Sequence, residues 1–179
     1  MSQAPADGPT TLFIREYFPF VWRVLRRLGL SPADADDAAQ RVMLVVAQRR
    51  SDIVEGRERA FLYRTASFLV ARERRRRRRR PECTGMELDE HEHPGADPEE
   101  LLVERQQREW LDTVLGCMQP ELRAAFVLFE IEGLTRDEVA HALDVPAGTA
   151  ASRVRRAREE FARRARQLAL GERVKGATA

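Results

Sequence analysis

Apolar side chains recur every three or four residues through most of the chain, which is the period of one face of an α-helix. Runs that alternate between apolar and polar residues are few, and β-branched residues are sparse. The apolar stripes predict helices over residues 11–28, 32–48 and 58–80, then helices that begin at residues 98 and 120, a short helix over 135–143 and a longer one to about residue 170. The sequence therefore predicts an all-α fold.

Capping residues mark the ends of several of these helices. Ser31 and Asp97 each precede a proline and acidic residues, which is typical of a helix N-terminus. Gly29 and Gly133 follow the last apolar residues of their helices, where glycine commonly ends a helix. Pro19 lies inside the first stripe, so we expect it to kink that helix or to divide it.

The net charge of +2 hides a separation of charges along the chain. Residues 1–80 carry a net charge of +9, residues 81–120 carry −9, and residues 121–179 carry +2. The acidic stretch begins with prolines, glycines and acids that show no periodicity, so residues 81–97 read as a flexible, extended linker. This organisation predicts two small helical domains, over residues 10–80 and 98–170, and favours a nucleic-acid-binding protein.

Residues 135–161 carry the clearest functional pattern. Thr135 and Glu138 match a capping box at the start of a short helix. A turn from Asp144 leads into an arginine-rich helix with a predicted inward face of Ala147, Ala150, Val154, Ala157 and Phe161, and an outer face that bears Ser152, Arg155, Arg156 and Glu159. Two helices joined in this way are typical of a helix-turn-helix whose second helix enters the major groove of DNA. A solvated helix that packs through its alanines is the alternative.

A second basic feature is the run of seven arginines from Arg74 to Arg80. Side chains at consecutive positions of a helix point in all directions, so they cannot all pack against protein. Because the run continues an amphipathic helix, we favour binding to nucleic-acid phosphates, with a steep dependence on salt. A localisation tract or a solvated tail is the alternative.

Other chemistry is poorly supported. Cys83 and Cys117 form no C-x-x-C pair, so we expect a reducing compartment and no disulfide framework. Cys83, His91 and His93 lack the regular spacing of a zinc site. The neighbouring carboxylates of Asp36 and Asp37 diverge on a helix, and no nucleophile accompanies them. With no membrane-length apolar run and no signal-peptide pattern, we expect a cytoplasmic, non-enzymatic protein without a cofactor.

Four segments together resemble one protein family. Residues from Asp34 to Leu44 and from Phe61 to Ala66 resemble conserved region two of the extracytoplasmic-function (ECF) sigma factors of bacterial RNA polymerase. Residues from Gly133 to Ala140 and from Gly148 to Arg158 resemble their region four. The order and spacing of these segments and the acidic linker between them match the pattern of that family over residues 11 to about 166.

The resemblance implies a protein that directs RNA polymerase core to a set of promoters. Region two is expected to hold the polymerase clamp through one helix face, which consists of Asp36, Asp37, Gln40, Arg41 and Leu44. From the sequence alone, this face is either ordinary helix surface or a protein-binding surface. Region two is also expected to capture the melted minus-ten strand through Tyr63, Arg64, Phe68, Arg72, Arg74, Arg75 and Arg78. Region four is expected to contact the polymerase flap and to bind the minus-thirty-five element through Thr149, Ser152, Arg153, Arg155, Arg156 and Arg158. Of these, Ser152, Arg155 and Arg156 match base-reading positions, and Arg153 and Arg158 are expected to contact phosphates.

The chain departs from the family pattern at three positions. Ala151 stands where a basic or polar residue is common, so one DNA contact is absent. The family usually has Trp at the position of Phe61 and Asn at the position of Phe68. That Asn helps to hold the melted strand, and Ile53 and Val54 lie in the loop that usually receives a flipped base.

Two other classes of protein remain as alternatives. A helix-turn-helix regulator would bind duplex DNA without polymerase, and a sigma-like adaptor would bind polymerase without opening DNA. Members of the family are often held by an anti-sigma factor, which is therefore a further expected partner.

Overall fold

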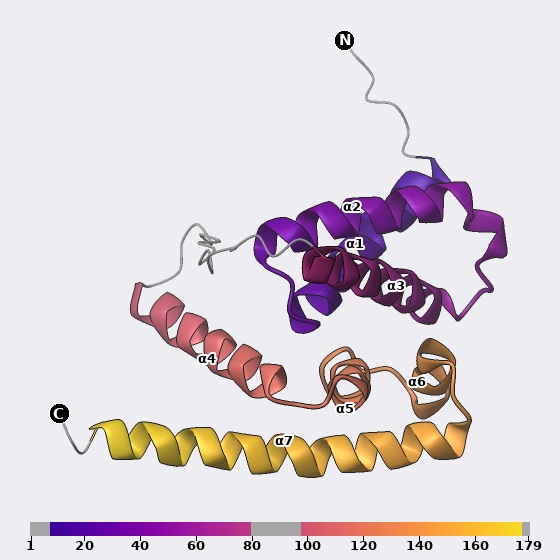
Figure 1. Ribbon diagram of the computed structural model, residues 1–179. Helices are drawn as coiled ribbons and strands as arrows, with labels where there is room; N and C mark the ends of the chain where they lie inside the picture. Colours follow the sequence, from indigo (N-terminus) through magenta and orange to yellow (C-terminus); the bar gives the residue numbers. More distant parts are fainter. Residues whose placement is uncertain (1–7, 80–97, 177–179) are drawn as a thin grey trace. The chain divides into compact units, whose positions relative to one another are not determined.

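The computed structural model describes residues 8–79 and 98–176, and all regular structure in these ranges is helical (Figure 1). The α-helices are α1 (Pro9–Arg27), α2 (Pro32–Gln48), α3 (Glu58–Arg79), α4 (Pro98–Gly116), α5 (Pro120–Phe126), α6 (Arg136–Leu143) and α7 (Ala147–Gly176). The all-α prediction is confirmed. The expected linker, residues 81–97, lies outside the described residues, and so do Cys83, His91 and His93.

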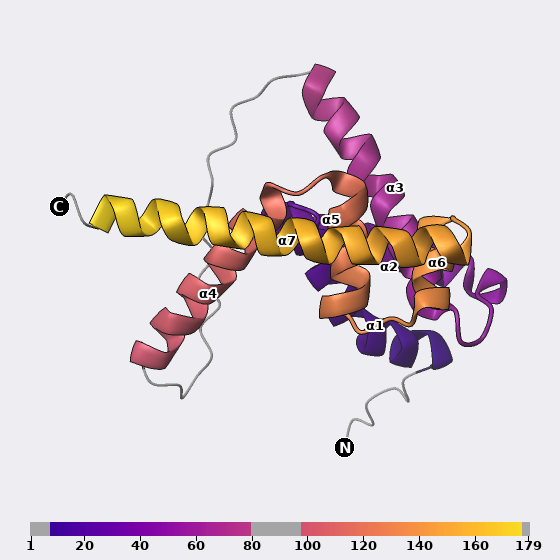
Figure 2. The same ribbon diagram turned by 90° about the horizontal axis from the view of Figure 1, so that it is seen from below.

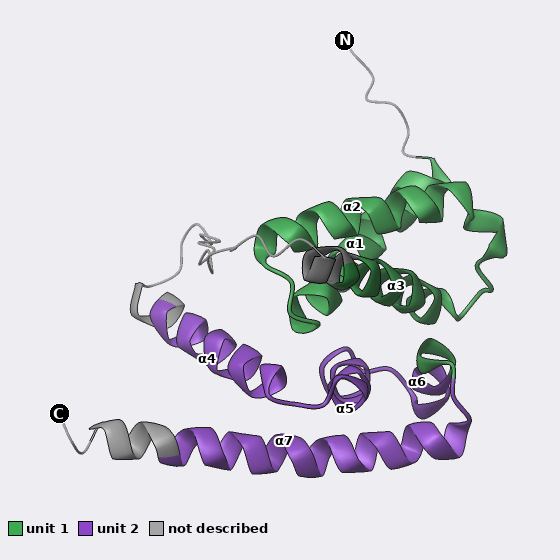
Figure 3. Ribbon diagram, in the orientation of Figure 1, with its two compact units in different colours: residues 1–87, 141–144 green, residues 88–140, 145–179 purple. Residues whose placement is uncertain are grey.

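The chain divides into two compact units (Figure 3). One comprises residues 1–87 and 141–144, and contains α1, α2 and α3. The other comprises residues 88–140 and 145–179, and contains α4, α5, α7 and most of α6.

In the first unit, α1, α2 and α3 pack against one another pairwise. Their inward faces meet in a core of small and branched side chains: Val21, Val24, Leu25, Ala39, Val42, Val46, Leu62 and Ala66. Full burial of one valine or leucine contributes about 1.5–3 kcal/mol, so this core accounts for the stability of a short three-helix bundle. The packing leaves one side of α2 and one side of α3 facing solvent.

The turn between α1 and α2 follows the sequence signals. Gly29 has φ of +95°, a conformation that glycine adopts without strain. Its N–H donates to the carbonyl of Arg26 at 2.9 Å, and the N–H of Leu30 donates to that of Leu25 at 3.3 Å, which is the Schellman pattern. Ser31 then caps α2 by accepting a hydrogen bond from the N–H of Asp34 at 3.2 Å.

Pro19 does not divide α1, so that part of the expectation is wrong. Proline deprives the carbonyl four residues earlier of its helical partner. Pro19 lies on the exposed side of the helix, where water can hydrate that carbonyl.

Nearby, partial burial raises the pKa of the Tyr17 phenol, and the negative charges of Glu16 and Glu58 raise it further.

In the second unit, α4 and α5 lie against the long helix α7 (Figure 2). The ring of Phe161 on α7 stacks on Phe126 with centroids 4.3 Å apart, and meets Trp110 edge-on at 6.2 Å. After α5, a π-helical turn spans Val127–Ile131. Gly133, with φ of +69°, then ends this segment as predicted.

Candidate nucleic-acid interface

The capping box predicted for α6 is present. The N–H of Thr135 donates to a carboxylate oxygen of Glu138 at 2.7 Å, and the N–H of Glu138 donates to Thr135 Oγ1 at 3.3 Å. These reciprocal bonds satisfy two backbone donors that a helix start leaves open. They fix where α6 begins, and therefore where the turn after it lies.

The turn between α6 and α7 has the same geometry as a glycine-ended helix, but the residue in the left-handed conformation is Asp144, with φ of +54°. The N–H of Val145 donates to the carbonyl of Ala140 at 3.0 Å, and the N–H of Asp144 donates to that of His141 at 3.3 Å. Aspartate tolerates this conformation better than most residues. Pro146 then precedes the first residue of α7, so the chain passes from one helix to the next in three residues.

Both helices bury small and branched side chains in the second unit. Val139 and Ala140 from α6 are buried, as are Ala150, Val154 and Ala157 from α7. These three α7 residues confirm most of the predicted inward face, and Phe161 is half-buried. Ala147 is a correction, because it is exposed: it is the first residue of α7, at the open end next to the turn.

The outer face of α7 presents the predicted DNA-reading side chains to solvent. Ser152, Arg155 and Arg156 are exposed, whereas Thr149 and Arg153 are half-buried. Arg155 forms an ion pair with Glu159 at 2.8 Å, and the hydroxyl of Ser152 donates to the carbonyl of Thr149 at 2.9 Å. Arg156 makes no ion pair with another described residue, so its guanidinium has all its donors available.

Arg158 differs from the other arginines of α7. Its guanidinium forms an ion pair with Glu130 from the π-helical turn and lies over the ring of Phe129, 5.2 Å from the centroid. These partners precede Arg158 by nearly thirty residues, and nothing in the local sequence indicated them. The contact fastens the middle of α7 to the segment before the helix-turn-helix.

The outer stripe of α3 carries a different set of side chains. Arg64, Phe68, Arg72 and Arg75 are exposed, and the side chains of Arg74 and Arg78 lie outside the described residues. Phe68 is 68% exposed, the most of any large apolar side chain among the described residues. Tyr63 lies on the opposite face and is only 5% exposed, so it belongs to the core and not to this stripe.

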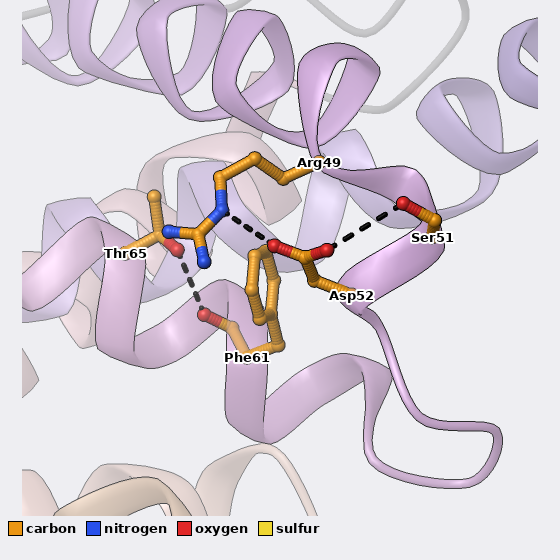
Figure 4. A network of polar contacts seen from close by, with 5 residues as sticks. All are labelled: Arg49, Ser51, Asp52, Phe61 and Thr65. Atoms are coloured by element: carbon orange, nitrogen blue, oxygen red, sulfur yellow. Dashed lines mark hydrogen bonds and ion pairs between the residues drawn. The ribbon is translucent and has the colours of Figure 1, made fainter.

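A short turn precedes α3 (Figure 4). It spans Arg50–Asp52 and is closed by an ion pair of 2.8 Å between Arg49 and Asp52. The two aliphatic residues that follow have different surroundings, since Ile53 is buried and Val54 is 62% exposed. Only Val54 is available to a nucleotide, and Ile53 belongs to the core.

The predicted polymerase-binding face of α2 is also open to solvent. Asp37, Gln40, Arg41 and Leu44 are exposed, and Asp36 is half-buried. Leu44 is 64% exposed, next to an Asp37–Arg41 pair at 4.0 Å. An apolar side chain beside weakly paired charges is a common composition for a protein-binding surface.

The described residues offer neither a metal-binding cluster nor a membrane-spanning helix. No cluster of three or more His, Cys, Asp or Glu side chains there could hold a metal ion. No helix within the same ranges has the length and apolar character needed to cross a bilayer.

Comparison with known protein families places two matches on these units. Residues 13–80 match the family model described as sigma-70 region 2. Residues 108–161 match the one described as sigma-70, region 4.

Two curated proteins of similar sequence belong to the same family. The chain is 30% identical over 149 residues to the ECF RNA polymerase sigma factor SigE of Mycolicibacterium smegmatis, in an alignment that spans 83% of this chain and 58% of that protein. It is 32% identical over 139 residues to the ECF RNA polymerase sigma-E factor of Escherichia coli strain K12, spanning 70% of this chain and 71% of that protein.

Two solved structures share the fold. One is the sigma factor RpoE in complex with the anti-sigma factor NepR from Bartonella quintana, with a TM-score of 0.65 at 18% identity, covering 85% of this chain and 95% of that chain. The other is CnrH in complex with the cytosolic domain of CnrY, with a TM-score of 0.60 at 19% identity, covering 86% of this chain and 84% of that chain.

Proposed function

The chain belongs to the family of ECF RNA polymerase sigma factors, and from this premise we propose that it directs bacterial RNA polymerase core to a set of promoters. Its activity is to confine transcription initiation to those promoters, and it catalyses no reaction of its own. We place it in the cytoplasm, where the polymerase works.

The observation that carries this proposal is the joint presence of two unlike surfaces. The helix-turn-helix begins with the capped helix α6 and presents Arg155 and Arg156 on the exposed face of α7, where a major-groove reader needs them. The three-helix unit presents an apolar and charged face on α2 and a basic, aromatic stripe on α3. A regulator that reads only duplex DNA has no need of the three-helix unit.

The proposed division of labour follows the surfaces. Residues 10–80 bind core polymerase through Asp36, Asp37, Gln40, Arg41 and Leu44, and hold the melted minus-ten strand through the arginines and Phe68 of α3. Residues 98–170 read the minus-thirty-five element and contact the polymerase flap, and residues 81–97 link the two. The DNA-reading set on α7 is Thr149, Ser152, Arg153, Arg155 and Arg156, while Arg158 reaches a phosphate only by leaving Glu130.

An anti-sigma factor is a further proposed partner, because one solved structure with this fold is a sigma factor in complex with the anti-sigma factor NepR. In the other, CnrH is likewise in complex with another protein, the cytosolic domain of CnrY.

Run-off transcription with purified core polymerase and a library of genomic fragments tests the proposal. A sigma factor yields transcripts from defined start sites that core polymerase alone does not produce. Tight binding to duplex DNA without polymerase, and no such transcripts, identifies a regulator that binds DNA alone. Core binding with no open complex identifies an adaptor. Either of the last two results contradicts the proposal.

A further inference from the structure

A small hollow lies in the second unit, between the end of α4 and the C-terminal half of α7. Its volume is about 190 Å³. Pockets for drug-sized ligands have volumes of about 300–1,000 Å³, and one water occupies about 30 Å³ in the liquid, so this hollow fits a small group of several heavy atoms. The side chains around it are those of Val114, Cys117, Arg164, Gln167 and Leu168.

Two polar atoms beside the hollow are buried without a hydrogen bond to any described residue. One is Oε1 of Glu160, whose side chain is only 6% exposed, and the other is Nε of Arg164. Glu160 precedes Arg164 by one helical turn, on the stripe of α7 that continues to Leu168. The Glu160 oxygen lies 3.7 Å from a terminal guanidinium nitrogen of Arg163 and of Arg164, which is too long for a hydrogen bond. The hollow therefore adjoins one acceptor and one donor that still need partners.

Cys117 gives the hollow a group that can form a covalent bond. Its thiol is free and the residue is exposed, so a small molecule can reach it from solvent. The backbone N–H of Cys117 donates to the carbonyls of Thr113 at 3.2 Å and Val114 at 3.1 Å, which holds the residue at the end of α4. Disulfide exchange at Cys117 would place the remainder of an attached thiol compound against the wall that Arg164 forms.

The two polar atoms without partners select the ligand. A carboxylate accepts hydrogen bonds and suits the Nε–H of Arg164, whereas an ammonium group donates them and suits Oε1 of Glu160. An α-amino acid carries both groups on one carbon atom, and cysteine adds the thiol that exchange requires. We therefore propose that Cys117 is a site of modification by cysteine, at which the attached cysteine directs its carboxylate to Arg164 and its ammonium group to Glu160. This inference does not depend on the sigma function proposed above.

Disulfide exchange with cystine, the disulfide of cysteine, supplies the adduct. The thiolate of Cys117 attacks one sulfur of cystine, a bond forms between these two sulfurs, and the cystine S–S bond breaks. The released cysteine thiolate takes up the proton that Cys117 gave up. Cystine is the oxidant, Cys117 is oxidised to the mixed disulfide, and one cysteine leaves in reduced form. Occupancy of the hollow therefore follows the ratio of cystine to cysteine.

The test measures the equilibrium constant for mixed-disulfide formation at Cys117, by mass spectrometry of the intact full chain with Cys83→Ser. Three couples are compared: cysteine with cystine, cysteamine with cystamine, which lack the carboxylate, and β-mercaptopropionate with its disulfide, which lack the ammonium group. Glu160→Gln should lower the constant about tenfold for cysteine and cysteamine, and should not lower it for β-mercaptopropionate. Arg164→Met should lower it about tenfold for cysteine and β-mercaptopropionate, and should not lower it for cysteamine.

Cys117→Ser with Cys83 intact is the matched control, because the same two substitutions should leave exchange at Cys83 unchanged. Thermal unfolding checks that each variant folds, and each substitution tests the inference by itself, so failure of one variant to fold leaves the other as the test. Arg164→Lys, which keeps the charge, should restore most of the constant for cysteine. The inference is overturned if Cys117 forms no mixed disulfide, or if a substitution changes all three constants equally. Unchanged constants in both folded variants would also overturn it, and would mean that water satisfies the two polar atoms.

Discussion

Helices α3 and α7 are both rich in arginine, but they present it in different ways. On α7, some arginines are paired with carboxylates: Arg155 is paired with Glu159, and Arg158 is held by Glu130. On α3, Arg72 and Arg75 have no ion pair with a described residue and share their stripe with Phe68. A reader of duplex DNA needs side chains in fixed positions, whereas capture of a single strand needs positive charge and an apolar surface.

The largest effect tests whether the two surfaces are independent. Val154→Asp buries an unpaired carboxylate on the packed face of α7, which should destabilise the second unit by about 3–5 kcal/mol. Binding to the minus-thirty-five duplex should be lost, while single-strand binding by the polymerase complex persists. Thermal unfolding and the two binding assays measure this, and Ala162→Asp, at an exposed position of the same helix, is the control. Loss of both activities would show that the units fold together.

The next prediction concerns the α2 face. Charge reversal at Asp37 combined with Gln40→Ala should weaken binding to core polymerase by at least about 2 kcal/mol. The double change replaces a negative charge by a positive one, and removes a polar side chain, in the proposed interface. Helical content should be unchanged, since both side chains are exposed. Pull-down with core polymerase and circular dichroism measure the two quantities. Unchanged affinity for core polymerase would remove this face from the interface.

The third prediction separates base readout from phosphate binding. Arg156→Ala should cost about 1–3 kcal/mol at one base pair of the minus-thirty-five element and relax specificity there. Arg75→Ala should instead weaken single-strand binding for all sequences and reduce the slope of log affinity against log salt by about 0.7. Affinities across a set of altered promoters and salt concentrations measure both. If Arg156→Ala lowers affinity uniformly, Arg156 is a phosphate contact.

A smaller effect is expected at the cap of α6. Thr135→Ala removes the side chain that accepts from Glu138 N–H, and should lower the free energy of unfolding of the second unit by about 1 kcal/mol. Affinity for duplex DNA should fall with it, because the cap positions the turn before α7. Ser51→Ala, in the turn of the other unit, serves as the control. Equal stability of Thr135→Ala and wild type would mean that packing alone positions α6.

The smallest effect concerns Arg158. Glu130→Gln removes the charge that holds this guanidinium, and should strengthen binding to duplex DNA by less than about 1 kcal/mol. The salt slope should steepen by about 0.9 if Arg158 gains a phosphate. Titrations at several salt concentrations measure it. If instead Glu130→Gln weakens binding, Glu130 positions Arg158 for DNA rather than withholding it.

Some features of the site were predictable because they depend on residues close in sequence. The Thr135–Glu138 cap involves residues three apart, and Gly29 and Gly133 ended their helices as local signals indicated. The inward positions Ala150, Val154 and Ala157 followed from helical period alone. Ala147 did not, because periodicity does not tell where the packed part of a helix begins.

The sequence by itself determined the helices, their caps and the chemical character of the α3 and α7 faces, since each depends on interactions within a few residues. Only the tertiary structure decided which side chains remain available. It placed Tyr63 in the core and Phe68 in solvent, although both lie on the same helix. It also paired Arg158 with Glu130 and left Arg156 without a partner among the described residues, because these outcomes depend on where a distant segment packs against α7.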